Sequence, residues 1–150
     1  MNAEQYQYTT NPDFLDFEFI SEGPKGKIRK IIRYISRDVN GILFYNLGFG
    51  DLDEETGQIN ELAISDNNDR NKVPATVAAT VLAFTLRFPG AIIYARGSTL
   101  ARTRLYQIGV VAHWDQIIGL LEVYGFANGK WEKFAKNVNY DALLVFRKKV

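Results

Sequence analysis

The sequence predicts an α+β protein with one mixed sheet flanked by helices. Residues 14–65 alternate between apolar and polar side chains, which is typical of strands with one buried face. From Val73 the apolar residues recur at helical spacing instead. A short apolar strand, a second helix and a hairpin signal then follow. We therefore expect an antiparallel meander, a helix-strand-helix crossover and a C-terminal hairpin, all built on one sheet.

The composition indicates a single domain over residues 1–150, with 47% hydrophobic and 23% charged residues. A net charge of +1 argues against nucleic acid or an anionic membrane as partner. The absence of cysteine excludes disulfides, thiolate catalysis and cysteine-type zinc sites. The start has no signal-peptide pattern, and the longest apolar run is far shorter than the roughly 20 residues that span a bilayer. We expect a cytoplasmic protein.

The meander is expected to have about four strands, over residues 14–20, 27–35, 42–51 and 58–65. In the third strand Gly48 and Gly50 share one face. They mark either a bulge or a packed neighbouring side chain, or else a place where a ligand lies across the strand. The second strand has a basic outer face, which is either solvated or a surface for nucleic acid or a protein partner. Its cations and those of the preceding turn are Lys25, Lys27, Arg29, Lys30 and Arg33.

The second half of the chain begins with a helix near Val73, which Pro89-Gly90 ends. A buried strand over 91–95 leads into a helix over 98–108 that Gly109 closes. A short helix over 113–119 and three strands, over 120–126, 131–135 and 142–147, complete the chain. Asn128-Gly129 is a hairpin turn signal between the first two of these strands.

The start of the helix over 98–108 is the best candidate for a functional site. A helix that follows a buried strand presents free N–H groups and a positive dipole end. Gly97 lets a ligand approach the backbone, Ser98 is a natural N-cap, and Thr99 offers a hydroxyl group. With Arg102 they form a possible site for a phosphate-type anion. The alternative is that Ser98 only caps the helix and that the arginines are surface or ion-paired groups.

A helical wheel assigns different roles to the two arginines of this helix. Ala101, Leu105 and Ile108 share one face, which we expect to be buried. Arg102 and Tyr106 lie roughly opposite and are neighbours. Arg104 lies nearer the apolar face, where a charge needs a partner, so a structural ion pair is expected. The nearest candidate carboxylates are Asp51, Asp53 and Glu61.

Two further places in the sequence could carry chemistry. The acidic residues Asp51, Asp53, Glu54 and Glu55 could hold a metal, but a solvated hairpin turn is favoured. His113 could act as a general base, but its position at a helix start beside Trp114 favours a structural role. With one histidine and no cysteine, no metal site is assigned.

Three strings resemble an uncharacterised family of small bacterial proteins, a domain of unknown function, over nearly the whole chain. They are Tyr45-Asn46-Leu47-Gly48-Phe49-Gly50-Asp51, Ala75-Thr76-Val77-Ala78-Ala79-Thr80-Val81, and Gly97-Ser98-Thr99 with Ala101-Arg102-Thr103-Arg104-Leu105-Tyr106. This resemblance implies no activity.

The order of the elements resembles the Gcn5-related N-acetyltransferase fold. In that fold a loop before the first long helix holds the coenzyme A pyrophosphate, and a tyrosine on the second helix often serves as general acid. Leu105-Tyr106-Gln107-Ile108-Gly109-Val110 resembles the end of that second helix, so the resemblance implies Tyr106 as the catalytic acid. The chain departs from the fold in lacking its initial helices and the glycines of its first loop, where residues 66–72 offer Arg70.

Two functions follow from these observations, and neither identifies a cofactor. In the first, the protein is an acyltransferase-like enzyme that holds a small anionic ligand with Ser98, Thr99 and Arg102, in a pocket at the carboxyl end of the strand over 91–95. In the second, it is a non-catalytic interaction module, such as a toxin–antitoxin or phage-defence component. The second function predicts a protein partner or homodimer, paired Arg102 and Arg104, and an exposed apolar patch.

Overall fold

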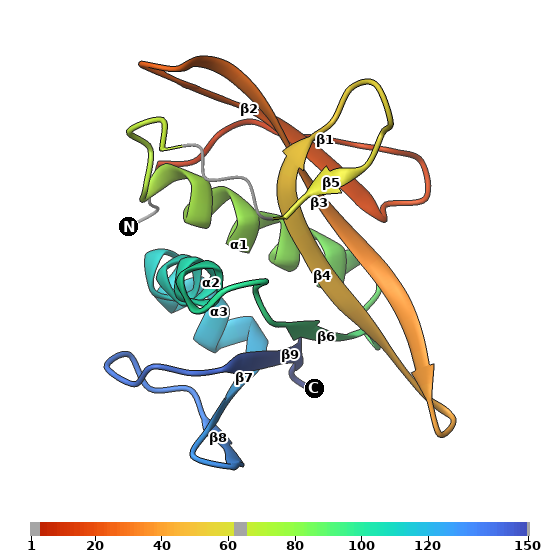
Figure 1. The fold of residues 1–150 in the computed structure, drawn as a ribbon. Coiled ribbons are helices and arrows are strands. Elements are labelled where there is room, and N and C mark those ends of the chain that lie inside the picture. The colour runs from red at the N-terminus through yellow and green to blue at the C-terminus, as the bar shows by residue number, and fades with distance from the viewer. Residues whose placement is uncertain (1–3, 62–65, 150) are drawn as a thin grey trace.

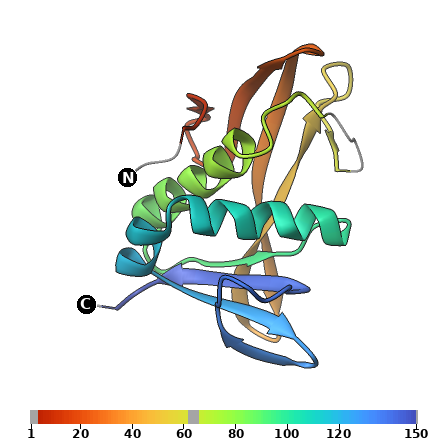
Figure 2. The ribbon, with the colours of Figure 1, turned by 90° about the vertical axis from the view of Figure 1, so that its left-hand side faces the viewer.

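The computed structural model describes residues 4–61 and 66–149, which form one mixed sheet with helices on one of its faces (Figures 1 and 2). In these ranges the strands are β1 (Thr9–Thr10), β2 (Asp16–Gly23), β3 (Gly26–Val39), β4 (Ile42–Leu52), β5 (Ile59–Asn60), β6 (Ile92–Ala95), β7 (Leu121–Ala127), β8 (Lys130–Lys133) and β9 (Ala142–Arg147). The helices are α1 (Lys72–Arg87), α2 (Leu100–Ala112) and α3 (Trp114–Leu120). The predicted α+β class is confirmed.

The sheet has the strand order β1-β2-β3-β4-β6-β9-β7-β8, and β5 pairs with the end of β4. The strands β2, β3 and β4 are antiparallel, so that Phe17, Ile32 and Phe49 lie side by side in one row. The fourth predicted strand, over 58–65, is described only as β5, because residues 62–65 lie outside the described residues.

The helix α1 connects β4 to β6, which are parallel strands. Their register joins Tyr45 to Ile93 and Asn46 to Tyr94. From β6 the chain continues through α2 and α3 to β7, and all three helices lie on the same face of the sheet (Figure 2). Within the described residues, no helix is long and apolar enough to cross a membrane.

The predicted C-terminal hairpin is formed by β7 and β8. Asn128 and Gly129 connect the two strands with φ angles of 54° and 78°, as a tight hairpin turn requires. The last strand, β9, does not lie at the edge but between β6 and β7. The C-terminal segment therefore completes the interior of the sheet.

The core lies between α1, α2 and the sheet. The rings of Tyr34 and Phe84 stack with centroids 4.0 Å apart, and Phe17 meets Tyr34 edge to face at 5.7 Å. The Tyr34 hydroxyl forms a hydrogen bond of 2.9 Å with Thr80 Oγ1. Burial raises the pKa of Tyr34, because the phenolate would be charged in an apolar surrounding. This cluster joins α1 to the centre of β3.

The two glycines of β4 make room for a neighbouring segment of the chain. A Cβ atom on Gly50 would lie 2.3 Å from the carbonyl oxygen of Asn60 and 2.8 Å from Ile59 Cγ2. A Cβ atom on Gly48 would lie 3.7 Å from Ile59 Cδ1. Of the two interpretations of these glycines, the structure supports the packed neighbour.

The helix α2 differs from its prediction at both ends. It begins at Leu100 with Thr99 as N-cap, whose Oγ1 accepts a hydrogen bond from the Arg102 backbone N–H. It continues through Gly109 to Ala112. A Cβ atom on Gly109 would lie 2.5 Å from the carbonyl oxygen of Pro74, so this glycine allows α2 to approach α1 rather than ending the helix.

The buried face of α2 is the one that the helical wheel placed outside. Thr103, Tyr106 and Val110 are buried, whereas Ala101 and Ile108 are exposed. The prediction was wrong because α2 packs on α1 through a small residue, Gly109, and on the sheet through an aromatic ring. The apolar stripe of Ala101, Leu105 and Ile108, which the helical wheel placed in the core, is therefore not the face on which α2 packs.

The basic face of β3 is largely neutralised by carboxylates. All of these pairs cancel local positive potential, and the exposed ones stabilise the fold little, whereas the Lys30–Asp51 pair is nearly buried. The pairs are Arg29 with Glu18 and Glu54, Arg33 with Asp16, Lys30 with Asp51, and Lys27 with Glu22.

The helical glycines provide a matched test of the α1–α2 packing. Gly109→Ala should lower the free energy of unfolding by about 1–3 kcal/mol, because the methyl group meets the backbone of α1. Gly119→Ala in α3, where a Cβ atom meets nothing within 4 Å, should raise it by about 0.5–1 kcal/mol through helix propensity. Urea denaturation of both variants measures the difference, and effects of the same sign would contradict the packing argument.

Candidate functional site

The predicted anion-binding residues do lie together, in the turn between β6 and α2. Gly97 approaches its own helix: a Cβ atom there would lie 2.4 Å from Arg102 Cβ and 2.6 Å from the Thr103 nitrogen. The Gly97 N–H donates a hydrogen bond of 3.0 Å to Thr103 Oγ1. The glycine is therefore required by the packing of the turn against α2, irrespective of any ligand.

Ser98 and Arg102 converge on one oxygen atom. The Ser98 hydroxyl donates to the carbonyl oxygen of Glu61 at 2.8 Å, and Arg102 Nη2 donates to the same oxygen at 2.9 Å. The Arg102 guanidinium also lies over the Phe49 ring, 5.0 Å from its centroid, a distance that permits a cation–π interaction. Two of the predicted anion ligands thus hold the end of the β4–β5 hairpin segment against α2.

A groove of about 370 Å³ opens beside this turn, between α1, α2 and the end of the meander. The exposed stripe of α2 forms one wall, and the first turn of α1 contributes Val73 and Pro74. The side chain of Ile108 is 43% exposed here. The lining residues are Lys30, Phe49, Glu61, Asp66, Asp69, Arg70, Val73, Pro74, Thr99, Ala101, Arg102, Leu105 and Ile108. The groove therefore has an apolar side and a charged side.

Some of the charged side chains of the groove, including Lys30 and Asp69, are held by other groups of the protein. Lys30 is 5% exposed and pairs with Asp51 across β3 and β4. Asp69 accepts hydrogen bonds from the hydroxyls of Ser21 and Tyr6, the latter at 2.8 Å. These bonds fix the loop before α1 on β2 and on the N-terminal arm. The charged side of the groove is thus built from fixed side chains of several distant segments.

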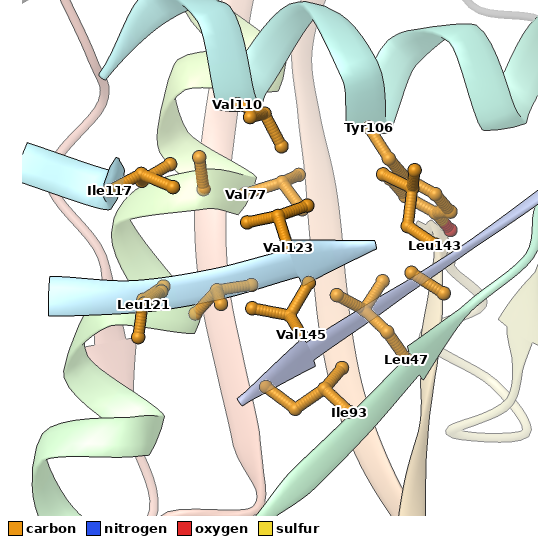
Figure 3. A pocket seen from close by; sticks show the side chains of 13 residues that line it. Leu47, Val77, Ile93, Tyr106, Val110, Ile117, Leu121, Val123, Leu143 and Val145 are labelled. Carbon is orange, nitrogen blue, oxygen red and sulfur yellow. The ribbon is translucent and has the colours of Figure 1, made fainter. Parts of the chain in front are cut away.

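Tyr106 is not at the groove. Its side chain is 6% exposed and lines a small cavity of about 30 Å³ in the core, together with Val110, Leu143 and ten other apolar residues of the sheet and helices (Figure 3). Burial raises its pKa above the ordinary value, although the nearby positive charge of Arg102 acts in the opposite direction. The expected outward orientation of Tyr106 beside Arg102 is wrong, because the ring fills the space between α2 and the sheet. Its role as general acid stays a prediction.

Arg104 has neutral partners where a carboxylate was expected. Its Nη1 donates to the carbonyl oxygen of Tyr140 at 2.8 Å and to Gln107 Oε1 at 3.0 Å. Asp51, one of the candidate partners, pairs with Lys30. The side chain of Arg104 points to the loop before β9, where it lines a separate depression of about 680 Å³ with Lys136. In the described part of the chain Arg104 thus donates to neutral oxygens, and the structural ion pair stays a prediction.

No local pattern in the sequence identifies the walls of the groove, because they come from segments that are far apart in the chain. Lys30, Phe49 and Pro74 meet only through the tertiary fold. The one available signal was the apolar stripe of α2, which the wheel assigned to the core. In the described ranges 4–61 and 66–149, no group of three or more metal-ligating side chains is present.

Replacing Arg104 should separate its structural role from that of an exposed arginine in the same segment. Arg104→Ala should lower the free energy of unfolding by about 1–3 kcal/mol, because the half-buried Tyr140 carbonyl loses a charged donor. Arg96→Ala, at an exposed position, should change it by less than about 0.5 kcal/mol. Thermal and urea unfolding measure both values, and equal losses would rule out the assigned role.

Comparison with known proteins places the chain in a family. No curated protein and no solved structure matches it. A model of a family of unknown function, DUF6934, matches residues 2–148, which include the turn, the groove and the three strings noted in the sequence. Because this match covers nearly the whole chain, the protein belongs to the DUF6934 family.

Proposed function

We propose that the groove between α1 and α2 binds a small ligand with an anionic head and an apolar body, of the acyl-coenzyme A type, and that the protein is a divergent acyltransferase-like enzyme. The observation that carries this proposal is the apolar stripe Ala101, Leu105 and Ile108, which lines the groove; Ala101 and Ile108 are exposed, and Leu105 is partly buried against the core. Concave sites with a mainly apolar wall and a few fixed polar groups are typical of ligand-binding sites.

The divergence of two parallel strands supports this location. β4 and β6 pair over two residues, and the end of β4 is then occupied by β5. The groove lies beyond the carboxyl end of β6, where open sheets with a parallel crossover bind ligands. The order of the elements resembles that of the Gcn5-related N-acetyltransferases, in which the loop before the first long helix holds the coenzyme A pyrophosphate.

The charges of the groove suit an anionic acyl donor and an amine acceptor. Arg70 and Arg102 would share the anion, while Glu61 and Asp66 would attract a cationic amine and accept its proton. In the reaction the amine nitrogen attacks the thioester carbonyl, a C–N bond forms as the C–S bond breaks, and the departing thiolate takes up a proton. Thr99 and Arg102 line the groove and would contact the acyl donor, whereas Tyr106 lies outside the groove.

A second function, that of a non-catalytic interaction module, is supported by a different surface. The tip of the β3–β4 hairpin extends away from the helices (Figure 1) and carries Val39, Ile42 and Leu43, which are 52%, 62% and 54% exposed. Arg102 and Arg104 are both engaged by the protein itself, as a module without a ligand requires. This function predicts no response to small anions.

A thermal-shift and calorimetric titration with coenzyme A, acetyl-coenzyme A and inorganic phosphate tests the enzyme proposal. Coenzyme A at about 100 times its Kd should raise the Tm by about 5–10 °C. Arg102→Gln should weaken this binding by about tenfold or more, because a charged donor is lost. Ser98→Ala is the matched control, since it removes a bond to the same Glu61 carbonyl without a change of charge.

The outcomes of this titration separate the two functions. If Ser98→Ala weakened binding as much as Arg102→Gln, the effect would come from the position of the Glu61 segment rather than from the charge. If no ligand raised the Tm even at millimolar concentration, the ligand site would be abandoned in favour of the interaction module.

A further inference from the structure

One face of the sheet is left without a covering layer. Ile93, Leu121 and Val145 point toward the helices and line the core cavity (Figure 3). Because side chains alternate along a strand, their neighbours on β6, β7 and β9 point to the opposite face. In the described ranges all helices lie on one side of the sheet, so this opposite face is open (Figures 1 and 2).

The open face is strongly aromatic. Six aromatic side chains from five neighbouring strands are partly or well exposed there: Phe44, Tyr94, Tyr124, Phe126, Trp131 and Phe146. Four of them form a chain of ring contacts, in which the centroids of Phe44 and Tyr94, of Tyr94 and Trp131, and of Trp131 and Phe126 are 6.2, 6.4 and 5.1 Å apart. Tyr124 and Phe146 form a separate stacked pair at 5.9 Å. Monomeric proteins rarely expose a continuous apolar patch of this extent, and aromatic residues are enriched in protein interfaces.

Aliphatic residues extend the same patch and favour a protein partner over nucleic acid. Ile35, Val39 and Ile42, on the β3–β4 hairpin, are 37%, 52% and 62% exposed. Single-stranded nucleic acid is recognised by aromatic rings interleaved with cations, whereas aliphatic side chains offer nothing to bases or phosphates. An apolar protein surface is the complement that such side chains require.

One row of residues across this face carries opposite charges at its two ends and apolar side chains between them, so it matches the same row of a second molecule turned by 180°. Neighbouring residues on β3 and β4 are Arg37 and Phe44, and those on β6, β9 and β7 are Ile92, Phe146 and Glu122. The parallel register of β4 and β6 places Phe44 beside Ile92. The row therefore reads Arg, Phe, Ile, Phe, Glu, with its centre on β6 and opposite charges about 19 Å apart at a strand spacing of about 4.8 Å.

We propose that the protein forms a two-fold symmetric homodimer in which the open sheet faces pack against each other, with the symmetry axis running along β6. A rotation about this axis superposes the ends of the row, so that Arg37 meets Glu122 of the partner subunit and Phe44 meets Phe146 of the partner subunit. The next row, Ile35, Asn46, Tyr94, Leu144 and Tyr124, carries no charge and lies in the apolar centre. Such an isologous contact closes on itself and leaves the α1–α2 groove on the outside.

Sedimentation equilibrium of the full chain and of charge variants tests this arrangement. The wild-type protein should be a dimer in reversible equilibrium with monomer. Arg37→Glu should raise the dimer Kd by about tenfold or more, because two carboxylates then face each other at each end of the row. Arg37→Glu combined with Glu122→Arg should restore a Kd near the wild-type value. Lys25→Glu, the same charge change in the β2–β3 turn, should have no effect.

Three results would overturn the proposal. The first is a wild-type protein that stays monomeric at every concentration. This result would count against the dimer even if the monomer bound a single-stranded oligonucleotide or another protein through this face. The second is a dimer that the double variant fails to restore. The third is a dimer whose Kd does not change in Arg37→Glu and which is lost only in Tyr94→Arg. The open face would then still be the dimer interface, but the two-fold arrangement along β6 would be excluded.

Discussion

The short parallel pairing of β4 with β6 is the constraint on which the rest of the structure depends. Two residue pairs, Tyr45 with Ile93 and Asn46 with Tyr94, join the N-terminal meander to the C-terminal half of the sheet. The crossover through α1 that this pairing requires places the helices on one face. Where the two strands diverge, the fold opens the groove, and the opposite face of the same strands is left bare. The candidate ligand site and the candidate interface are thus two consequences of one connection.

The polar groups around the groove hold parts of the chain in place, and the same groups would be available to the proposed ligand. Ser98 and Arg102 hold a backbone carbonyl, and Asp69 ties the loop before α1 to β2 and to Tyr6. A ligand would therefore enter a site whose donors are already oriented, at a reduced entropic cost. Because guanidinium has five N–H donors, Arg102 can in principle serve both the chain and an anion. The groove and the open face lie on opposite sides of the sheet, so the proposed ligand binding and the proposed association would not compete.

The helix α2 shows which structural properties can be predicted from a sequence pattern and which cannot. Local chemistry predicted that this helix exists, that a hydroxyl group caps its start, and that Gly97, Ser98, Thr99 and Arg102 lie close together. Only the identity of the cap differed, since the cap is Thr99 and not Ser98. Its orientation was not, because a helix with Ala101, Leu105, Ile108 on one side and Tyr106, Val110 on the other has two faces that can be buried. The choice depends on what packs beside it, and Gly109 selects α1 as the close neighbour. The partners of Arg104 depend on the same choice.

The sequence by itself determined the α+β class, three antiparallel strands that correspond to β2, β3 and β4, the position of the crossover and the turn at Asn128-Gly129, because periodicity and turn chemistry are local properties. It also located the turn at Gly97-Ser98-Thr99. Only the tertiary structure decided that β9 lies inside the sheet, that Tyr106 is buried while Ile108 faces a groove, and that Lys30 and Phe49 share a site with α2. These outcomes depend on contacts between segments far apart in the chain, whose free energies no local pattern contains.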